Sequence, residues 1–201
     1  MQPFIRVRGA AAAMPAANID TDVIMPKQFL KGIDRSGLDR GLFHDLRFEG
    51  QGRERSDFVL NQPSWRNAAF LVVGPNFGCG SSREHAVWGL MQYGIRALIG
   101  TSFAGIFFDN CARNGLLAIT LDAAMHAEVS RAAADAERCE LDVDLDRQVI
   151  SGSALEIGFA IDRMRRHALL TGLDAIGQTL LARDEIAAFE QRYLRETPWL
   201  S

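Results

Sequence analysis

Residues 68–94 read AAFLVVGPNFGCGSSREHAVWGLMQYG and contain a strand, a glycine-rich loop and a helix in succession. The run from Ala68 to Val73 is continuously apolar and stops at a Gly-Pro pair, a pattern typical of a strand buried on both faces. After the loop, residues 83–93 place their apolar side chains on one helical stripe that ends at Gly94. This stretch therefore predicts an α/β fold.

The same alternation of strands and helices continues beyond this stretch. Asp122 stands where the cap of an Ala-rich helix is expected, a helix that runs to about Glu137. Residues 141–145 alternate apolar and polar side chains with a period of two, which predicts a hairpin with the strands that follow. The strands expected from such patterns are 4–7, 58–60, 68–73, 97–100, 116–120, 141–145, 148–150 and 155–161, and a short helical stretch is expected from Phe103.

The chain has 201 residues, of which 48% are hydrophobic and 23% charged, so it has enough apolar side chains for one sizeable core. At roughly 150 residues per domain, a single domain with peripheral additions is expected over residues 1–201. Glycine and polar residues at about 31–56 predict an irregular excursion. The helical spacing of apolar residues near the end predicts a C-terminal helical extension at about 162–201.

Charge and cysteine content argue against several classes of protein. The 22 Lys and Arg against 25 Asp and Glu give a net charge of −3, whereas nucleic-acid or anionic-membrane binding needs a concentrated basic face. Cys79, Cys111 and Cys139 are too far apart for a disulfide framework, which predicts a reducing, cytoplasmic location. No apolar run approaches the roughly 18 residues that span a bilayer. The Ala-rich stretch 10–17 matches a signal peptide poorly because Pro15 interrupts it.

The glycine-rich loop at residues 74–85 closes on two serines and Arg83 at the start of a helix. Unpaired N–H groups and the positive end of the helix dipole favour a carboxylate or phosphate there, and the guanidinium adds a two-pronged contact. A helix N-cap formed by Ser81 or Ser82 explains the same residues equally well. In the anion-binding interpretation a serine of this loop can act as a base rather than a nucleophile, because the dipole and the neighbouring cation stabilise its alkoxide, but the residues alone do not choose between these roles.

Cys79 offers a competing chemistry in the same loop. A thiol near a helix N-terminus with an arginine close by is a candidate nucleophile, and His85 stands six residues further on. The other interpretation of Cys79 is a buried, inert cysteine. The four histidines show no metal-ligand spacing, so no metal site is expected in this chain.

Residues 18–26 read NIDTDVIMP and set two carboxylates and a hydroxyl in a loop before a proline. Asx-rich turns of this kind are usually local hydrogen-bonding devices. Asp20 and Asp22 alone supply too few ligands for a metal ion. Taken by itself, this loop is therefore interpreted as a turn.

Three motifs stand in order along the chain: NIDTDVIMPKQFL at 18–30, NFGCGSSREHA at 76–86 and SFAGIF at 102–107. Together with Asn110, GLL at 115–117 and GLDAIG at 172–177, they cover almost the whole chain. They resemble the small subunit of bacterial 3-isopropylmalate dehydratase, a member of the aconitase superfamily. The resemblance implies an α/β fold, a single swivelling β/β/α domain with a mixed sheet and peripheral helices. It also implies a separate large subunit that binds a [4Fe-4S] cluster.

The resemblance assigns roles to residues in the first two motifs. Ser81 and Asp22 are the predicted catalytic residues, with Ser81 as the base that removes a proton from carbon. Arg83 is predicted to hold a substrate carboxylate. Ser82 is predicted to place a hydroxyl beside the substrate, and Thr21 to face it from the other loop.

The resemblance also places the substrate-discriminating loop at the end of the first motif. This loop comprises Phe29, Leu30, Lys31 and Gly32. Exchanging it is therefore expected to change the preference for the alkyl substituent of the substrate.

With its large subunit, the family interconverts 2-isopropylmalate and 3-isopropylmalate by dehydration and rehydration in leucine biosynthesis. The resemblance implies a hydro-lyase that is active only in the complex, acts on a small dicarboxylate and has no cofactor bound by this chain. Three alternatives are weighed beside it: a related small subunit for another substituted malate or maleate, a thiol hydrolase that uses Cys79, and a non-catalytic anion-binding module. Activity without a partner would distinguish the hydrolase, and anion binding without turnover would distinguish the module.

Overall fold

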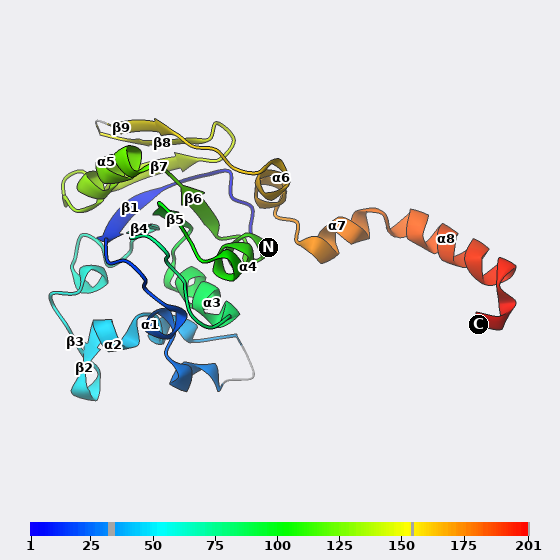
Figure 1. Ribbon diagram of the computed structural model, residues 1–201, viewed down its shortest axis with the longest axis horizontal. Coiled ribbons are helices and arrows are strands. Elements are labelled where there is room, and N and C mark those ends of the chain that lie inside the picture. Colours follow the sequence, from blue (N-terminus) through cyan, green and yellow to red (C-terminus); the bar gives the residue numbers. More distant parts are fainter. Residues whose placement is uncertain (32–34, 154, 201) are drawn as a thin grey trace.

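A seven-stranded mixed sheet forms the centre of the protein in a computed structural model that describes residues 1–31, 35–153 and 155–200 (Figure 1). The strand order is β6-β5-β4-β1-β7-β8-β9. The strands are β1 (Arg6–Met14), β4 (Phe70–Val73), β5 (Ala97–Gly100), β6 (Leu117–Thr120), β7 (Glu140–Asp144), β8 (Val149–Gly152) and β9 (Leu155–Gly158).

The parallel half of the sheet contains β1, β4, β5 and β6. All side chains of β4 and β5 are buried, which confirms the two strands predicted from continuous apolar runs. Alternate residues of β4 face opposite sides: Leu71 packs with helices α3 (Glu84–Tyr93) and α4 (Gly105–Asn114). Val72 packs instead with α5 (Ala123–Ala133), which lies on the other side of the sheet (Figure 1). Each face of the sheet therefore carries its own apolar core.

The antiparallel half is a meander of β7, β8 and β9 that joins the sheet along β1. Its strands confirm the hairpin predicted from period-two alternation. The pair Arg6–Asp142, at 2.7 Å, links the side chains of β1 and β7. Asp122 caps α5 as predicted, since its carboxylate accepts a hydrogen bond from the Met125 N–H at 2.8 Å.

The central strand β1 is longer than the sequence indicates, and the prediction of a strand at 4–7 misses most of it. Alanine has a low strand propensity, so the Ala-rich stretch indicates no particular element. In the fold, Ala11 and Ala12 are fully buried between the two cores. A Cβ at Gly9 would lie 2.8 Å from the Cβ of Ala69, so small residues let β1 approach its neighbour closely. Tertiary packing therefore overrides local propensity here.

The strand predicted at 58–60 is wrong, because Val59–Asn61 is a 3-10 turn, η4. The segment predicted to be an irregular excursion is also better packed than expected, since Leu38, Leu42 and Phe43 are buried. The helices and strands of this segment have only two to four residues each, and elements this short show no measurable hydrophobic period. They are η2 (Leu38–Arg40), α2 (His44–Arg47), β2 (Phe48–Glu49), η3 (Gly50–Gly52) and β3 (Arg53–Glu54).

The C-terminal part is helical and consists of α6 (Arg163–Thr171), α7 (Ala175–Leu181), α8 (Arg183–Glu196) and η5 (Pro198–Leu200). The helix α6 packs on the sheet through Leu169, whereas α7 and α8 project away from the body (Figure 1). Across the described residues, no helix is long and apolar enough to cross a membrane.

Candidate functional site

Three loops meet at one edge of the sheet, because β1, β4 and β5 run parallel and their carboxyl ends coincide. The loop after β4 is bound to the loop after β1 by the Gly78 N–H, which donates to the Ile19 carbonyl at 2.8 Å. It is bound to the loop after β5 by the Asn76 N–H, which donates to Ser102 Oγ at 2.9 Å. The three motifs that are separate in the sequence therefore form one structure.

The glycine-rich loop depends on left-handed backbone at Gly78 and Gly80, whose φ angles are 77° and 86°. A Cβ at Gly78 would stand 2.2 Å from the ring of Phe107. The loop therefore lies directly against the first turn of α4, and only glycine fits there.

Thr21 ties the Asp-Thr-Asp loop (residues 18–26) to the glycine-rich loop at residues 74–85, which we call the serine loop. Asp20 caps the short helix α1 (Thr21–Ile24) by accepting from the Val23 N–H at 2.8 Å. The buried hydroxyl of Thr21 donates to the Ser81 carbonyl at 2.7 Å. Asp20 therefore acts as a turn residue, in agreement with the interpretation of this loop as a turn. Thr21 fixes the backbone of Ser81.

Arg83 and Asp22 form an ion pair in which Nη1 of the guanidinium donates to the carboxylate. Nη1 also lies 3.5 Å from the Met25 carbonyl, and in the described part of the chain every polar contact of the Arg83 side chain uses this nitrogen. The Arg83 side chain is 17% exposed and that of Asp22 51% exposed. Nε and Nη2 are therefore available for a two-pronged contact with a carboxylate.

Arg83 lines a small hollow of about 150 Å³, and its partner Asp22 is not among the residues that line it. Ser81 and Ser82 are exposed, and neither hydroxyl has a hydrogen-bond partner among the described residues. The hollow is lined by Thr21, Gly78, Gly80, Ser81, Ser82, Arg83, Ala104, Gly105, Ile106 and Phe107.

Two helix N-termini meet at this hollow. The N-cap of α3 is Arg83 and that of α4 is Ala104, and neither makes a side-chain capping bond. The N–H groups of both first turns therefore favour an anion at this point. The proposal that Ser81 or Ser82 caps α3 is wrong, because the helix begins at Glu84.

Cys79 is half-buried, and in the described structure no hydrogen bond joins its thiol to His85. The His85 ring packs on Trp88 at a centroid distance of 4.7 Å. The structure therefore assembles no thiol–imidazole pair here. Cys111, by contrast, is fully buried, and burial raises the pKa of its thiol.

Phe29, Leu30 and Lys31, the described residues of the predicted substrate-discriminating loop, do not line the hollow. Phe29 and Leu30 belong to the 3-10 turn η1 (Lys27–Leu30) and pack against the core. The Phe29 ring lies 5.0 Å from that of His44. Lys31 is exposed, and Gly32 lies outside the described residues.

Comparison with known proteins identifies the family. The sequence profile of the aconitase C-terminal domain matches residues 1–124, and that of the C-terminal domain of the 3-isopropylmalate dehydratase small subunit matches residues 176–201. The 3-isopropylmalate dehydratase small subunit 1 of Mannheimia succiniciproducens is 55% identical over 100% of this chain and 99% of its own length. The chain belongs to the 3-isopropylmalate dehydratase small-subunit family. The small subunit 2 of Salmonella typhimurium is 53% identical over 100% of this chain and 96% of its own length.

A solved 3-isopropylmalate dehydratase from Methanocaldococcus jannaschii has the same fold as this chain. The TM-score is 0.68 at 25% identity, covering 92% of this chain and 99% of the other. The expected α/β fold of the aconitase superfamily is therefore confirmed.

The contribution of α4 is not predicted from the sequence patterns. Ala104, Gly105 and Ile106 line the hollow and belong to the SFAGIF motif, to which no site residue is assigned from sequence. The signal available was a glycine-containing helix start immediately after a buried strand, the same pattern that marks the loop after β4.

Proposed function

We propose that this chain is the small subunit of a 3-isopropylmalate dehydratase, a hydro-lyase that interconverts 2-isopropylmalate and 3-isopropylmalate in leucine biosynthesis. One observation carries the proposal. Two exposed serine hydroxyls and an arginine with free N–H groups stand at a hollow where two helix N-termini meet. This arrangement suits a small dicarboxylate that must be held at a carboxylate while a proton moves at the adjacent carbon.

Arg83 holds the substrate carboxylate in this proposal. Nε and Nη2 lie on one edge of the planar guanidinium, which matches the two oxygens of a carboxylate. Asp22 accepts from Nη1 and so fixes the plane of the guanidinium before substrate arrives. Asp22 acts on the reaction through Arg83, and Thr21 acts through the backbone of Ser81.

Ser81 takes the proton from carbon. A neutral hydroxyl is a poor base, so the reaction requires the alkoxide form, which the two helix dipoles and Arg83 stabilise. The proton is acidified by the adjacent carboxylate that Arg83 binds. Loss of the neighbouring hydroxyl as water gives the maleate, and water returns to the other carbon. Ser82 donates a hydrogen bond to the bound substrate.

The large subunit supplies the remainder of the active site. No group of three or more His, Cys, Asp or Glu that could hold a metal ion occurs within residues 1–31, 35–153 and 155–200. The three cysteines are free and stand apart in the chain, Cys79 in the loop after β4, Cys111 in α4 and Cys139 just before β7, so this chain's own residues do not fit an iron–sulfur cluster. We therefore assign the [4Fe-4S] cluster implied by the family to the large subunit. A cytoplasmic location stays a prediction.

Reconstitution tests this proposal. The chain is mixed anaerobically with the cognate large subunit, and the interconversion of the two isopropylmalates is measured beside malates with other alkyl groups. We expect the mixture to be active and neither chain to be active by itself. The isopropyl substrate is expected to be preferred. Turnover of another substituted malate at higher kcat/KM would identify the related hydro-lyase instead. Activity of this chain alone would contradict the proposal.

A further inference from the structure

The last part of the chain exposes an unusual amount of apolar surface. We call residues 175–200, which comprise α7, α8 and η5, the C-terminal arm. None of its residues is buried. Leu181 is 74% exposed and Trp199 75% exposed. Its exposed large apolar side chains are Ile176, Leu180, Leu181, Ile186, Phe189, Tyr193, Leu194, Trp199 and Leu200.

These side chains are arranged as a binding face. On α8, Ile186, Phe189 and Tyr193 recur at i, i+3 and i+7, and the Phe189 and Tyr193 rings stack at 5.6 Å. Gln191 lies about 200° around the helix from Phe189, on the polar side. An isolated helix of 14 residues is marginal in water, since most helix stability comes from packing of the apolar face. The apolar face of α8 is therefore expected to pack against the surface of another molecule.

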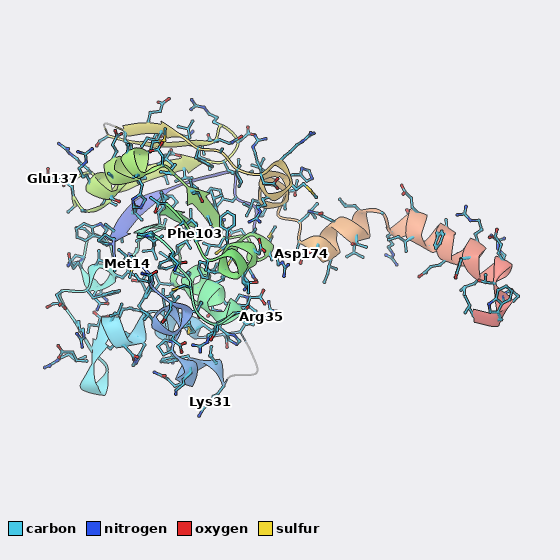
Figure 2. All side chains as sticks on the ribbon, viewed as in Figure 1. Met14, Lys31, Arg35, Phe103, Glu137 and Asp174 are labelled. Atoms are coloured by element: carbon cyan, nitrogen blue, oxygen red, sulfur yellow. The ribbon has the colours of Figure 1, made fainter. Side chains whose placement is uncertain are left out.

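The base of the arm is anchored to the body of the protein. The Phe4 N–H donates to the Leu169 carbonyl at 2.8 Å, and the N-terminal amine donates to the Gly172 carbonyl at 2.9 Å. The Arg166–Asp146 pair, at 2.8 Å, holds α6 on the loop that follows β7. Beyond Asp174 the chain leaves the body, and its side chains extend into open space (Figure 2). The helix α8 alone is about 21 Å long.

We propose that the C-terminal arm is the element by which this chain holds the large subunit, an inference that rests on the proposed function. Two observations select this occupant. The aconitase domain profile ends at residue 124, whereas the profile that covers the arm is described as belonging to the small subunit. The arm is thus a feature of the family in which this domain is a separate chain. A domain on a separate chain has no covalent link to the rest of the enzyme. It therefore needs a non-covalent contact that holds it there.

The size of the apolar face supports this assignment. Three aromatic and six aliphatic side chains of the arm are exposed. Because a buried aromatic side chain contributes on the order of 150 Å², this face approaches the roughly 800 Å² per partner of a stable interface. The catalytic hollow lies on the body, at the edge formed by β1, β4 and β5. The arm therefore holds the partner without using any residue of the hollow.

A chain that ends at Asp174 tests the inference. We expect it to fold, with a melting temperature close to that of the intact chain, since no residue of the arm is buried. Its affinity for the cognate large subunit is expected to fall at least 100-fold, measured by titration calorimetry. At saturating large subunit, kcat is expected to return to that of the intact chain, because Ser81 and Arg83 are unchanged.

Point variants locate the contact. Phe189→Ala and Tyr193→Ala are each expected to weaken large-subunit binding 10- to 100-fold, as aromatic residues at the centre of interfaces do. Gln191→Ala, on the opposite face of the same helix, is the matched control and is expected to bind normally. Hydrogen exchange of the α8 amides is expected to slow when the large subunit is added.

Three outcomes would overturn the inference. If the intact chain binds and is active while the arm variants bind equally well, the arm is not the docking element and the proposed function stands. If truncation instead converts a dimer of this chain into a monomer without changing large-subunit affinity, the arm binds a second copy. If the intact chain neither binds the large subunit nor turns over with it, the proposed function fails as well.

Discussion

Arg83 and Asp22 are 61 residues apart in the chain, yet the guanidinium of one donates to the carboxylate of the other beside the serine loop. Because of this pairing, two parts of the guanidinium have different roles. Nη1 is held by the protein, while Nε and Nη2 make no polar contact within the described residues and can receive a substrate. A cation fixed in this way needs little reorganisation when a carboxylate binds.

The first prediction concerns the planar geometry of Arg83. Arg83→Lys keeps the charge but cannot make two parallel hydrogen bonds to one carboxylate. A lost charge-assisted hydrogen bond of about 1.5–3 kcal/mol is expected to lower kcat/KM about 10- to 100-fold in the reconstituted complex. Thermal melting is expected to be unchanged, and Arg131→Lys on α5 is the control. Near-normal kcat/KM would show that Arg83 does not hold the substrate.

The second prediction concerns the loop at residues 29–32, which stays a predicted determinant of specificity. Phe29 and Leu30 pack against the core cluster that includes Ile24 of α1, the helix that carries Thr21 and Asp22. Exchange of this loop for that of a relative acting on another malate is expected to change the ratio of kcat/KM values by roughly tenfold to a hundredfold, because a methylene is worth about 1–3 kcal/mol. Identical ratios in a substrate panel before and after the exchange would exclude the loop from substrate choice.

The sequence predicts the fold well where its pattern is long and regular. The continuous apolar runs that become β4 and β5 and the stripe that becomes α3 need only local information. The Ala-rich part of β1 has no such pattern, because its place in the sheet depends on close packing with Ala69 and its neighbours. Long-range packing of this kind is absent from any short window of sequence.

The site is predictable in its residues but not in its connections. Motif and resemblance identify Ser81, Ser82 and Arg83, and these three line one hollow. That Thr21 fixes the Ser81 carbonyl depends on the parallel pairing of β1 with β4, which brings residues 60 apart into contact. The α4 N-terminus is brought in by the next strand of the same sheet. Topology, rather than spacing, therefore assembles the site.

The third prediction concerns the backbone of the serine loop. Gly78→Ala is expected to lower stability by at least about 2 kcal/mol, because Gly78 has a φ of 77° and a Cβ there would lie 2.2 Å from the Phe107 ring. Chemical denaturation measures the loss. Gly50→Ala is the matched control, since Gly50 is exposed and a Cβ there would meet nothing within 4 Å. Equal stability of the two variants would contradict the tight fit of this loop.

The fourth prediction is a pH dependence of stability. The hydrogen bonds donated by Arg6 lower the pKa of Asp142. Because the pKa is lower in the folded than in the unfolded state, the pair stabilises the protein above the unfolded value of about 3.9, and this contribution is lost as the pH falls through the folded pKa. Arg6 is 60% exposed, so solvent screens the pair and its contribution to the free energy of unfolding is expected to be small.

Melting curves of Asp142→Asn between pH 7 and pH 3 test this pair. The variant is expected to melt below the intact chain at pH 7 and to converge with it as the pH falls. Glu156→Gln, an exposed carboxylate on β9, serves as the control and is expected to show no such convergence. A difference that stays constant with pH would show that the Arg6–Asp142 pair does not contribute in its ionised form.

The fifth prediction separates the roles of Ser81 and Cys79 in the serine loop. Ser81→Ala is expected to reduce turnover of the reconstituted complex 10²- to 10⁴-fold, the typical contribution of general-base catalysis. Its melting temperature is expected to be unchanged, because the Ser81 hydroxyl caps no helix and α3 begins at Glu84. Cys79→Ala is expected to retain most of the activity, since the thiol has no imidazole partner within the described structure. If Cys79→Ala alone is inactive and remains folded, the proton-transfer mechanism is wrong and a thiol mechanism replaces it.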